Sequence, residues 1–331
     1  MGKKDASMKA LLSKNEVFAD ACNQYFFHGE KVVKPESLKE LDPTEIVLPF
    51  GKEEKEAVAN QKYRDILKLC TIKTDAKYTY CIFGIESQSN VHYAMPVRNF
   101  LYDAMQLTKQ VSEIVRKHKE QRKSKVKTKE EISSDEYLSG FYKTDKLIPV
   151  LTLVVYLGTD AWDGPTSLRE MYTETDEIVL QHVADYKMNL LDLTHCDDEE
   201  IARFCNDLFQ VTTFVKYSES IKEFWESVVK KERFSHVSRE AIDVVQSFTN
   251  YRFKVEEGKE DEDMCQALTD LIEEGRAEGR VEGLEQGLQQ ATQTILQKFL
   301  DAGMDEKEMQ RMLSVTPEEF DKMLQREPVE A

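Results

Sequence analysis

The sequence predicts a mixed α/β core, followed by an all-helical region and a helical acidic tail. Apolar runs rich in β-branched and aromatic residues indicate strands, and they lie between amphipathic helical patterns. Helical patterns then continue from about residue 172 to the end of the chain. We therefore expect three successive parts, namely a core at 13–160, a helical accessory domain at 161–255 and the tail at 256–331.

The core begins with a helix at 13–27, where a Ser/Asn cap signal precedes apolar residues at helical spacing. A short apolar stretch at 46–48 predicts a strand. The polar residues 53–64 predict a helix or a connector.

A hairpin follows, formed by the runs 65–72 and 78–85. Because apolar side chains fall on both faces of these strands, we expect both faces to be covered, as in a three-layer α/β sandwich. An amphipathic helix at 91–116 and a last strand within 147–158 complete the order helix, strand, strand, strand, helix, strand.

The sequence pattern of the C-terminal half predicts helices. Asp197 or Asp198 offers an N-cap for one helix, and residues 219–233 have the pattern of another. In the tail a glycine occupies every fourth position from 275 to 287, although each glycine costs a helix roughly 1 kcal/mol relative to alanine. Close approach of a partner helix or duplication of a short repeat would each account for this spacing.

The charge of −17 is unevenly distributed along the 331 residues. Residues 256–331 hold 21 acids and 8 bases, which leaves a net charge of only −4 for residues 1–255. Residues 116–129 hold eight Lys/Arg and one Glu, and we expect a solvated linker that can contact phosphates. The hydrophobic content of 40% excludes wholesale disorder, and the overall acidity excludes a uniformly basic protein that coats nucleic acid.

No apolar run reaches 18 residues and the N-terminus lacks the pattern of a signal peptide, so we expect a soluble, cytoplasmic protein. The six cysteines contain no C-x-x-C pair, and we expect reduced core thiols. A zinc site formed by His195, Cys196 and Cys205 is the alternative.

The strongest chemical signal comes from the hairpin. If its turn is centred between Asp75 and Ala76, paired residues have numbers that sum to 151, and Asp65 lies opposite Glu86. Because side chains on a strand alternate between faces, Gln88 shares the face of Glu86. Two carboxylates and an amide would then converge at one end of the sheet.

Two adjacent carboxylates favour binding of a divalent cation, and oxygen ligands suit Mg²⁺ or Mn²⁺. The alternative is that Asp65 and Glu86 are two solvated acids at strand ends. A slip of one residue in the pairing would also separate them.

Four segments, YRDILKL, YTYCIFGIESQS, HYAMPVRNFLYDAMQLTKQ and IPVLTLVVYLG, together with the Glu-Gly repeats of the tail, resemble the Rpn-type recombination-promoting nucleases. These proteins are also called PD-(D/E)XK nuclease family transposases. The resemblance covers roughly residues 13–160 and implies a restriction-endonuclease-like core that cuts DNA with Mg²⁺. In it, Asp65 matches the first acid of the family, and Glu86, Ser87 and Gln88 match the (D/E)XK segment.

Gln88 departs from the lysine of the general motif. A neutral amide can orient a water but cannot stabilise hydroxide by charge, so more of the activation would depend on the metal. In related folds the first helix adds an acid, for which Glu16 and Asp20 are both candidates.

Three further residues follow the predicted site. Arg98 and Tyr102 are one helical turn apart. They either face the DNA backbone or the site, or they form a pair on the helix surface. His92 fits a loop histidine better than a general base.

The sequence thus predicts a Mg²⁺-dependent DNA endonuclease for recombination or transposition-like processing, in which Asp65 and Glu86 bind the metal and Gln88 orients the water. We expect DNA as its partner and self-association through the tail. Two alternatives are a catalytically weak DNA-binding protein with the same fold and a structural assembly protein driven by the tail.

Overall fold

The computed structural model describes residues 2–42, 44–47, 60–63, 65–74, 77–123, 132–173, 176–218, 232–253, 261–262 and 264–324. The chain divides into two compact units, residues 1–264 and 265–331, and each is described by itself. Within the described ranges, none of the helices has the length and apolar character needed to cross a membrane.

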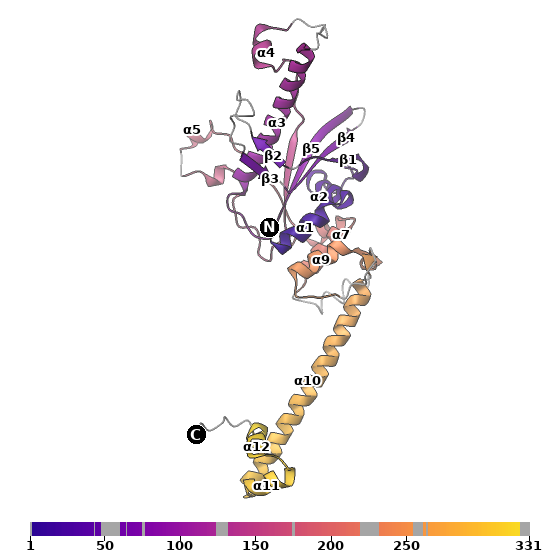
Figure 1. Ribbon diagram of the computed structural model, residues 1–331, viewed down its shortest axis with the longest axis vertical. Coiled ribbons are helices and arrows are strands. Elements are labelled where there is room, and N and C mark those ends of the chain that lie inside the picture. The colour runs from indigo at the N-terminus through magenta and orange to yellow at the C-terminus, as the bar shows by residue number, and fades with distance from the viewer. Residues whose placement is uncertain are drawn as a thin grey trace. The chain divides into compact units, whose positions relative to one another are not determined.

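The first unit is built on a five-stranded sheet, which confirms the predicted mixed α/β class (Figure 1). Its strand order is β1-β4-β5-β6-β7, antiparallel from β1 to β5 and parallel from β5 to β7. The strands are β1 (Leu38–Glu40), β4 (Ile66–Thr74), β5 (Lys77–Gln88), β6 (Val150–Tyr156) and β7 (Asn189–Asp192).

Pairing of β4 with β5 has the predicted register. Ile66 pairs with Ile85 and Thr74 with Lys77, so that all partner numbers sum to 151. Apolar side chains on both faces of this hairpin are buried, among them Leu67, Ile82 and Phe83. This burial agrees with the expectation of central strands covered on two sides.

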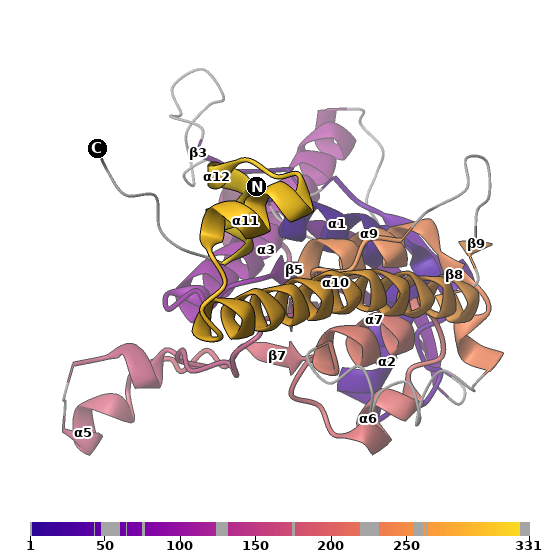
Figure 2. The ribbon, with the colours of Figure 1, turned by 90° about the horizontal axis from the view of Figure 1, so that it is seen from below.

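Helices cover the two faces of the sheet. On one face lie α1 (Lys3–Ser13) and α2 (Asn15–Phe27), where the Phe26 ring packs 5.7 Å from that of Phe83. On the other face lies α3 (Met95–Lys123), which contacts β6. The helices α7 (Asp207–Lys216) and α9 (Arg239–Phe248) pack against α2 and α1, so the later part of the unit extends the first helical layer (Figure 2).

Shorter elements connect these layers. They are the strands β2 (Thr44–Val47) and β3 (Asn60–Tyr63), which pair with each other, the strands β8 (Val237–Ser238) and β9 (Asp261–Glu262), which also pair, the helices α4 (Ser134–Ser139), α5 (Glu177–Leu180) and α6 (Asp198–Arg203), and the 3-10 turns Pro35–Ser37, Arg169–Met171 and Glu232–Phe234. The predicted cap of α6 is Asp197, whose side chain accepts from the backbone N–H of Glu200.

The structure differs from the predicted elements at several places. The first helix of the prediction is the second of two, because Met8, Leu11 and Leu12 already bury an apolar face on α1. Residues 60–63 form β3 instead of a helix or connector. The region after residue 160, expected to be all-helical, supplies β7 to the main sheet, since a run of four residues is too short for its pattern to reveal a strand.

The predicted linker also begins as helix. Helix α3 continues to Lys123, so residues 116–123 of the basic run are helical, while 124–129 lie outside the described residues. Lys and Arg are good helix formers, and near the C-terminal end of a helix their charge interacts favourably with the helix dipole. The helix predicted at 219–233 falls mostly on residues that are not described.

Four cysteines, Cys22, Cys70, Cys81 and Cys196, are buried free thiols, as expected for core cysteines. Cys205 is free as well but exposed. The His195 ring of the alternative zinc site lies 2.9 Å from Asp192 Oδ1.

The second unit consists of the long helix α10 (Met264–Asp301) and two short helices, α11 (Glu306–Leu313) and α12 (Pro317–Met323). Leu296 of α10 packs in a small core with Met309, Phe320 and Leu324. The helical tail of the prediction is therefore present in the described residues.

One charged side chain joins the sheet to the first helical layer. Lys68 of β4 is fully buried, and its Nζ donates to Ser13 O at 2.6 Å and to Asn15 Oδ1 at 2.5 Å. It thereby caps the C-terminal end of α1 and fixes the break between α1 and α2. Burial is the main influence on its amine and lowers the pKa of Lys68 below 10.5, although Glu40 acts in the opposite direction.

This shift predicts a pH effect on stability. A lowered pKa in the folded state means that the unfolded chain binds more protons, so stability rises with pH from the lowered pKa up to 10.5. Wild-type protein should therefore gain free energy of unfolding relative to Lys68→Met as the pH is raised toward 10.5 in urea titrations. Lys39→Met, at an exposed lysine on β1, is the control, and a constant difference between wild type and Lys68→Met would contradict the prediction.

Candidate functional site

The candidate site lies where β4 begins and β5 ends. The observed register places Asp65, just before β4, beside Glu86 of β5. Glu86 is fully buried, whereas Asp65 is partly exposed. The predicted meeting of two acids on neighbouring strands thus has a structural basis in the backbone pairing.

Each of these acids accepts a hydrogen bond from the strand of the other. The Asp65 N–H donates to Glu86 Oε1 at 3.2 Å, and the Ser87 N–H donates to Asp65 Oδ2 at 2.9 Å. The Ser87 hydroxyl donates to the same Asp65 oxygen, also at 2.9 Å. This reciprocal bonding takes over from the backbone ladder just before β4 begins and holds both carboxylates in place.

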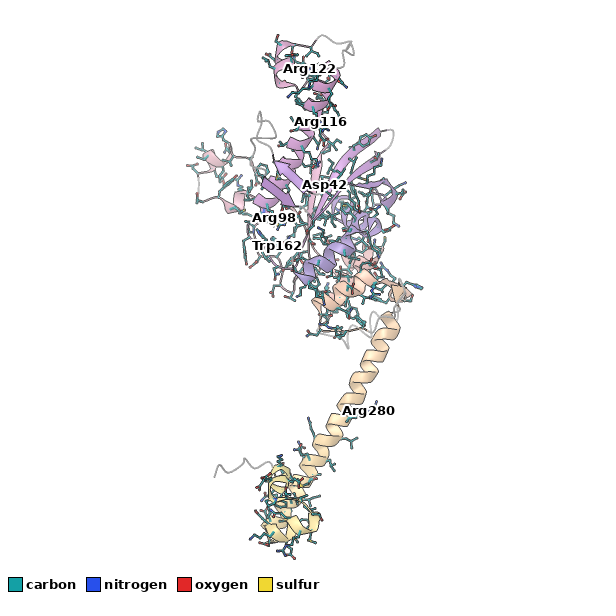
Figure 3. All side chains as sticks on the ribbon, viewed as in Figure 1. Asp42, Arg98, Arg116, Arg122, Trp162 and Arg280 are labelled. Carbon is teal, nitrogen blue, oxygen red and sulfur yellow. The ribbon has the colours of Figure 1, made fainter. Side chains whose placement is uncertain are left out.

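A cation from the opposite layer neutralises the buried carboxylate. Arg98 of α3 donates from Nη2 to Glu86 Oε2 at 3.0 Å and from Nε to the Tyr102 hydroxyl at 2.9 Å. Burial acts to lower the pKa of Arg98, but Glu86, Tyr102 and Asp65 outweigh it and raise that pKa above its usual range. Arg98 is therefore a permanent positive charge at the site, and Figure 3 shows its position beside the sheet.

Of the two readings for Arg98 and Tyr102, the structure supports the one in which they face the site. Their side chains contact each other, and Arg98 connects that pair to Glu86. Gln88 is the last residue of β5, is partly buried, and has the alternation that puts it on the face of Glu86.

Glu16 and Asp20 do not join this group. Their helix, α2, packs on the sheet face that carries Phe83, whereas Glu86 has the opposite parity and faces α3. Asp20 Oδ2 instead accepts from the Cys205 N–H at 2.8 Å. The acid that the first helices bring to the end of β5 is Asp5, which accepts from the Ser89 hydroxyl at 2.7 Å.

Sequence reasoning missed Asn99, a buried amide on α3. Its side chain is fully buried, and neither Nδ2 nor Oδ1 has a hydrogen-bond partner in the described structure. An unsatisfied buried polar group costs about 1–3 kcal/mol, so such a group implies a bound water or ligand, or a sacrifice of stability. Only the helical spacing of Met95, Asn99 and Tyr102 on the buried face could have pointed to it.

The position of Asn99 follows from its neighbours on α3. Met95, one turn earlier, packs in a cluster with Val154 of β6, and Val154 is the register partner of Glu86. Arg98, the residue before Asn99, contacts Glu86 directly. Asn99 therefore belongs to the layer between α3 and the part of the sheet that carries the acids.

The oxygen atoms of the site are ligands of the type that hard divalent cations bind. Asp65 and Glu86 provide carboxylate oxygens on adjacent strands, and only Oδ2 of Asp65 is used in the hydrogen bonds of the described structure. No group of three or more His, Cys, Asp or Glu able to hold a metal occurs among the described residues. A cation here would take two protein carboxylates and complete its shell with water and substrate oxygens, as Mg²⁺ commonly does.

The fold and site together define an α/β protein with two neighbouring acids, one buried and one partly exposed, at the open end of its central hairpin. Residues 55–237 match the family Transposase_31, described as "Putative transposase, YhgA-like". This match covers more than half of the chain, and the protein belongs to this family. The family agrees with the resemblance found in the sequence, and the matched range includes Asp65, Glu86, Gln88 and Arg98.

Two other comparisons, with curated proteins and with solved structures, found no match to this chain.

The Arg98–Glu86 ion pair predicts a strong dependence of stability on both partners. Arg98→Met leaves a buried carboxylate without its cation and should lower the free energy of unfolding by about 3 kcal/mol, the low end for a buried pair because the Arg98 side chain is 32% exposed. Adding Glu86→Gln should recover part of this loss. Arg116→Met, an exposed arginine of the same helix, is the control in denaturant titrations. Equal losses in the single and double variants would contradict the pairing.

Asn99 predicts a gain of stability on substitution. Asn99→Leu, of similar volume, removes two unsatisfied groups and should raise the free energy of unfolding by about 1 kcal/mol. The matched control is Asn23→Leu, because Asn23 is also buried but bonds both N–H and C=O of Val33, and its loss should destabilise the protein. A loss of stability in Asn99→Leu would show that the amide is satisfied in solution.

Proposed function

We propose that this protein is a Mg²⁺- or Mn²⁺-dependent DNA endonuclease with a restriction-endonuclease-like core, acting in recombination or transposition-like DNA processing. The observation that carries the proposal is the side-by-side placement of Asp65 and Glu86 on adjacent strands, with Arg98 against Glu86. Membership in a family described as transposase-like favours DNA as the substrate.

In this proposal Asp65 and Glu86 hold the cation. Bound Mg²⁺ supplies positive charge that promotes ionisation of water and stabilises charge developing on the phosphate oxygens. Gln88, on the face of Glu86, orients the water that attacks phosphorus. The water oxygen forms a new bond to phosphorus, and the bond from phosphorus to the leaving sugar oxygen breaks. The water loses a proton, and the leaving sugar oxygen gains one.

Arg98 has a second role once a cation occupies the acid pair. Its side chain is about one-third exposed, and its guanidinium, then partly relieved of neutralising Glu86, can donate to a phosphate oxygen. Tyr102 keeps the guanidinium oriented through its hydroxyl.

The basic C-terminal part of α3 fits a contact with the DNA backbone. Arg116, Lys117, Lys119 and Lys123 are exposed, and Arg116 and Arg122 lie toward the far end of α3 from Arg98 (Figure 3). The 18 residues from Arg98 to Arg116 span about 27 Å of helix, which corresponds to about eight base pairs of duplex. One helix could thus connect the acid pair with phosphates further along the DNA.

A second candidate is a DNA-binding protein of the same fold with little catalysis. Two observations favour it, namely the neutral Gln88 in place of lysine and the use of Glu86 as the ion-pair partner of Arg98. The two candidates differ in whether the protein cuts DNA when a divalent cation is supplied.

Plasmid nicking tests the proposal directly. Wild-type protein should nick supercoiled DNA with Mg²⁺ or Mn²⁺ and lose this activity in EDTA, while Asp65→Asn and Glu86→Gln should each reduce the rate by at least about 100-fold. DNA binding should persist in Asp65→Asn, because this change leaves the exposed bases of α3 intact. Glu120→Gln, at an exposed acid on α3, is the matched control.

Several results would redirect the assignment. Binding without nicking under any of the cations would favour the second candidate, and absence of binding would favour an assembly protein instead. Nicking at the wild-type rate in Asp65→Asn would remove that residue from the mechanism. Unchanged nicking in Gln88→Leu would show that another group orients the attacking water. Gln88→Lys should retain or increase the nicking activity.

A further inference from the structure

Helix α10 carries an apolar stripe that none of the described residues of its own unit covers. Exposed fractions range from 46% to 74% for its large apolar side chains, which are Val281, Leu284, Leu288, Ile295 and Phe299. The opposite flank of the same helix is occupied, because Leu296 and Leu300 pack with α11 and α12. The stripe is therefore separate from the small core of this unit.

The stripe has the spacing of a coiled coil. Val281, Leu284, Leu288 and Ile295 occupy positions a, d, a and a of successive heptads, with Ala291 at the intervening d position. β-branched residues at a with leucine at d favour two parallel strands. Because a heptad seam is complementary to the same seam on another copy, the pattern indicates a second copy of this chain as the occupant.

The glycines of α10 give a reason why the helix needs a partner. Gly283 and Gly287 lie outside the a and d positions, and a Cβ on either would have nothing within 4 Å. They do not serve close packing within the unit, yet each costs the helix about 1 kcal/mol relative to alanine. An exposed helix gains most of its stability from burial of an apolar face, so this glycine-rich helix requires that its stripe be covered.

We propose that α10 forms a parallel, two-stranded coiled coil with α10 of a second copy, with Val281, Leu284, Leu288 and Ile295 in the seam. The seam is short, and Ala291 and Lys298 weaken its d positions. The dimer should accordingly dissociate in the micromolar range. The proposal is independent of the nuclease assignment, because it concerns a different unit.

Light scattering of the full chain after size-exclusion chromatography tests the seam. At concentrations on the order of 100 µM the mass should be twice 38.4 kDa, and dilution should return it toward 38.4 kDa. Leu284→Lys combined with Leu288→Lys should give a monomer at every concentration. The matched control is Gln286→Lys, at the outward f position between them, which should leave the mass unchanged.

A cysteine in the seam tests the direction and register of the two helices. Leu284→Cys should form an intermolecular disulfide on mild oxidation, because a d residue meets its own counterpart only in a parallel, in-register pair. Gln286→Cys and the wild-type protein, with its own cysteines, should not.

The outcomes separate the possible occupants. A monomer up to about 100 µM would overturn the proposal and indicate that another surface covers the stripe. A trimer or larger assembly would overturn the two-stranded arrangement. A dimer that resists the double lysine variant would place the interface elsewhere, and absence of a disulfide in Leu284→Cys would overturn the parallel, in-register arrangement.

Discussion

The pairing of β4 with β5 determines where every group of the candidate site lies. Its register places Asp65 beside Glu86, and a shift of one residue would move one of them to the opposite face of the sheet. The acids also hold the end of this pairing, since each accepts an N–H from the other strand. Structure and candidate chemistry thus depend on the same hydrogen bonds, and a substitution at either acid affects both.

Helix α3 gives this site its charge balance. A fully buried carboxylate such as Glu86 is costly unless a cation accompanies it, and Arg98 meets this need from the opposite layer. The same helix carries the unpartnered Asn99 and, toward its far end, the exposed basic residues. One element therefore combines the neutralising cation, a buried polar group without a partner and a surface suited to phosphates.

The two units differ in how much apolar surface they bury. The first buries a large core between two helical layers, and this core offsets the cost of the polar site within it. In the second, a small core forms at the C-terminal end of α10, while the apolar stripe of that helix stays exposed. Most of the net negative charge belongs to the tail, which is consistent with assembly as its role and with DNA contacts in the first unit.

The sequence by itself determined the mixed α/β class, the three longest strands, the helices with clear amphipathic periods and the hairpin register. These features depend on local periodicity and on the symmetry of a tight turn, both of which can be read from neighbouring residues. The family resemblance could likewise be recognised from four short segments, and the comparison agrees with it.

Only the tertiary structure decided which distant groups meet the acid pair. Strands as short as β1 and β7 are stabilised by their partners in the sheet and have no pattern of their own. The side of the sheet on which each helix packs separates Glu16 and Asp20 from Glu86 and brings in Arg98, and no local spacing encodes that choice. Burial of Asn99 without a partner is likewise a property of packing, because satisfaction of a polar group depends on all the layers around it.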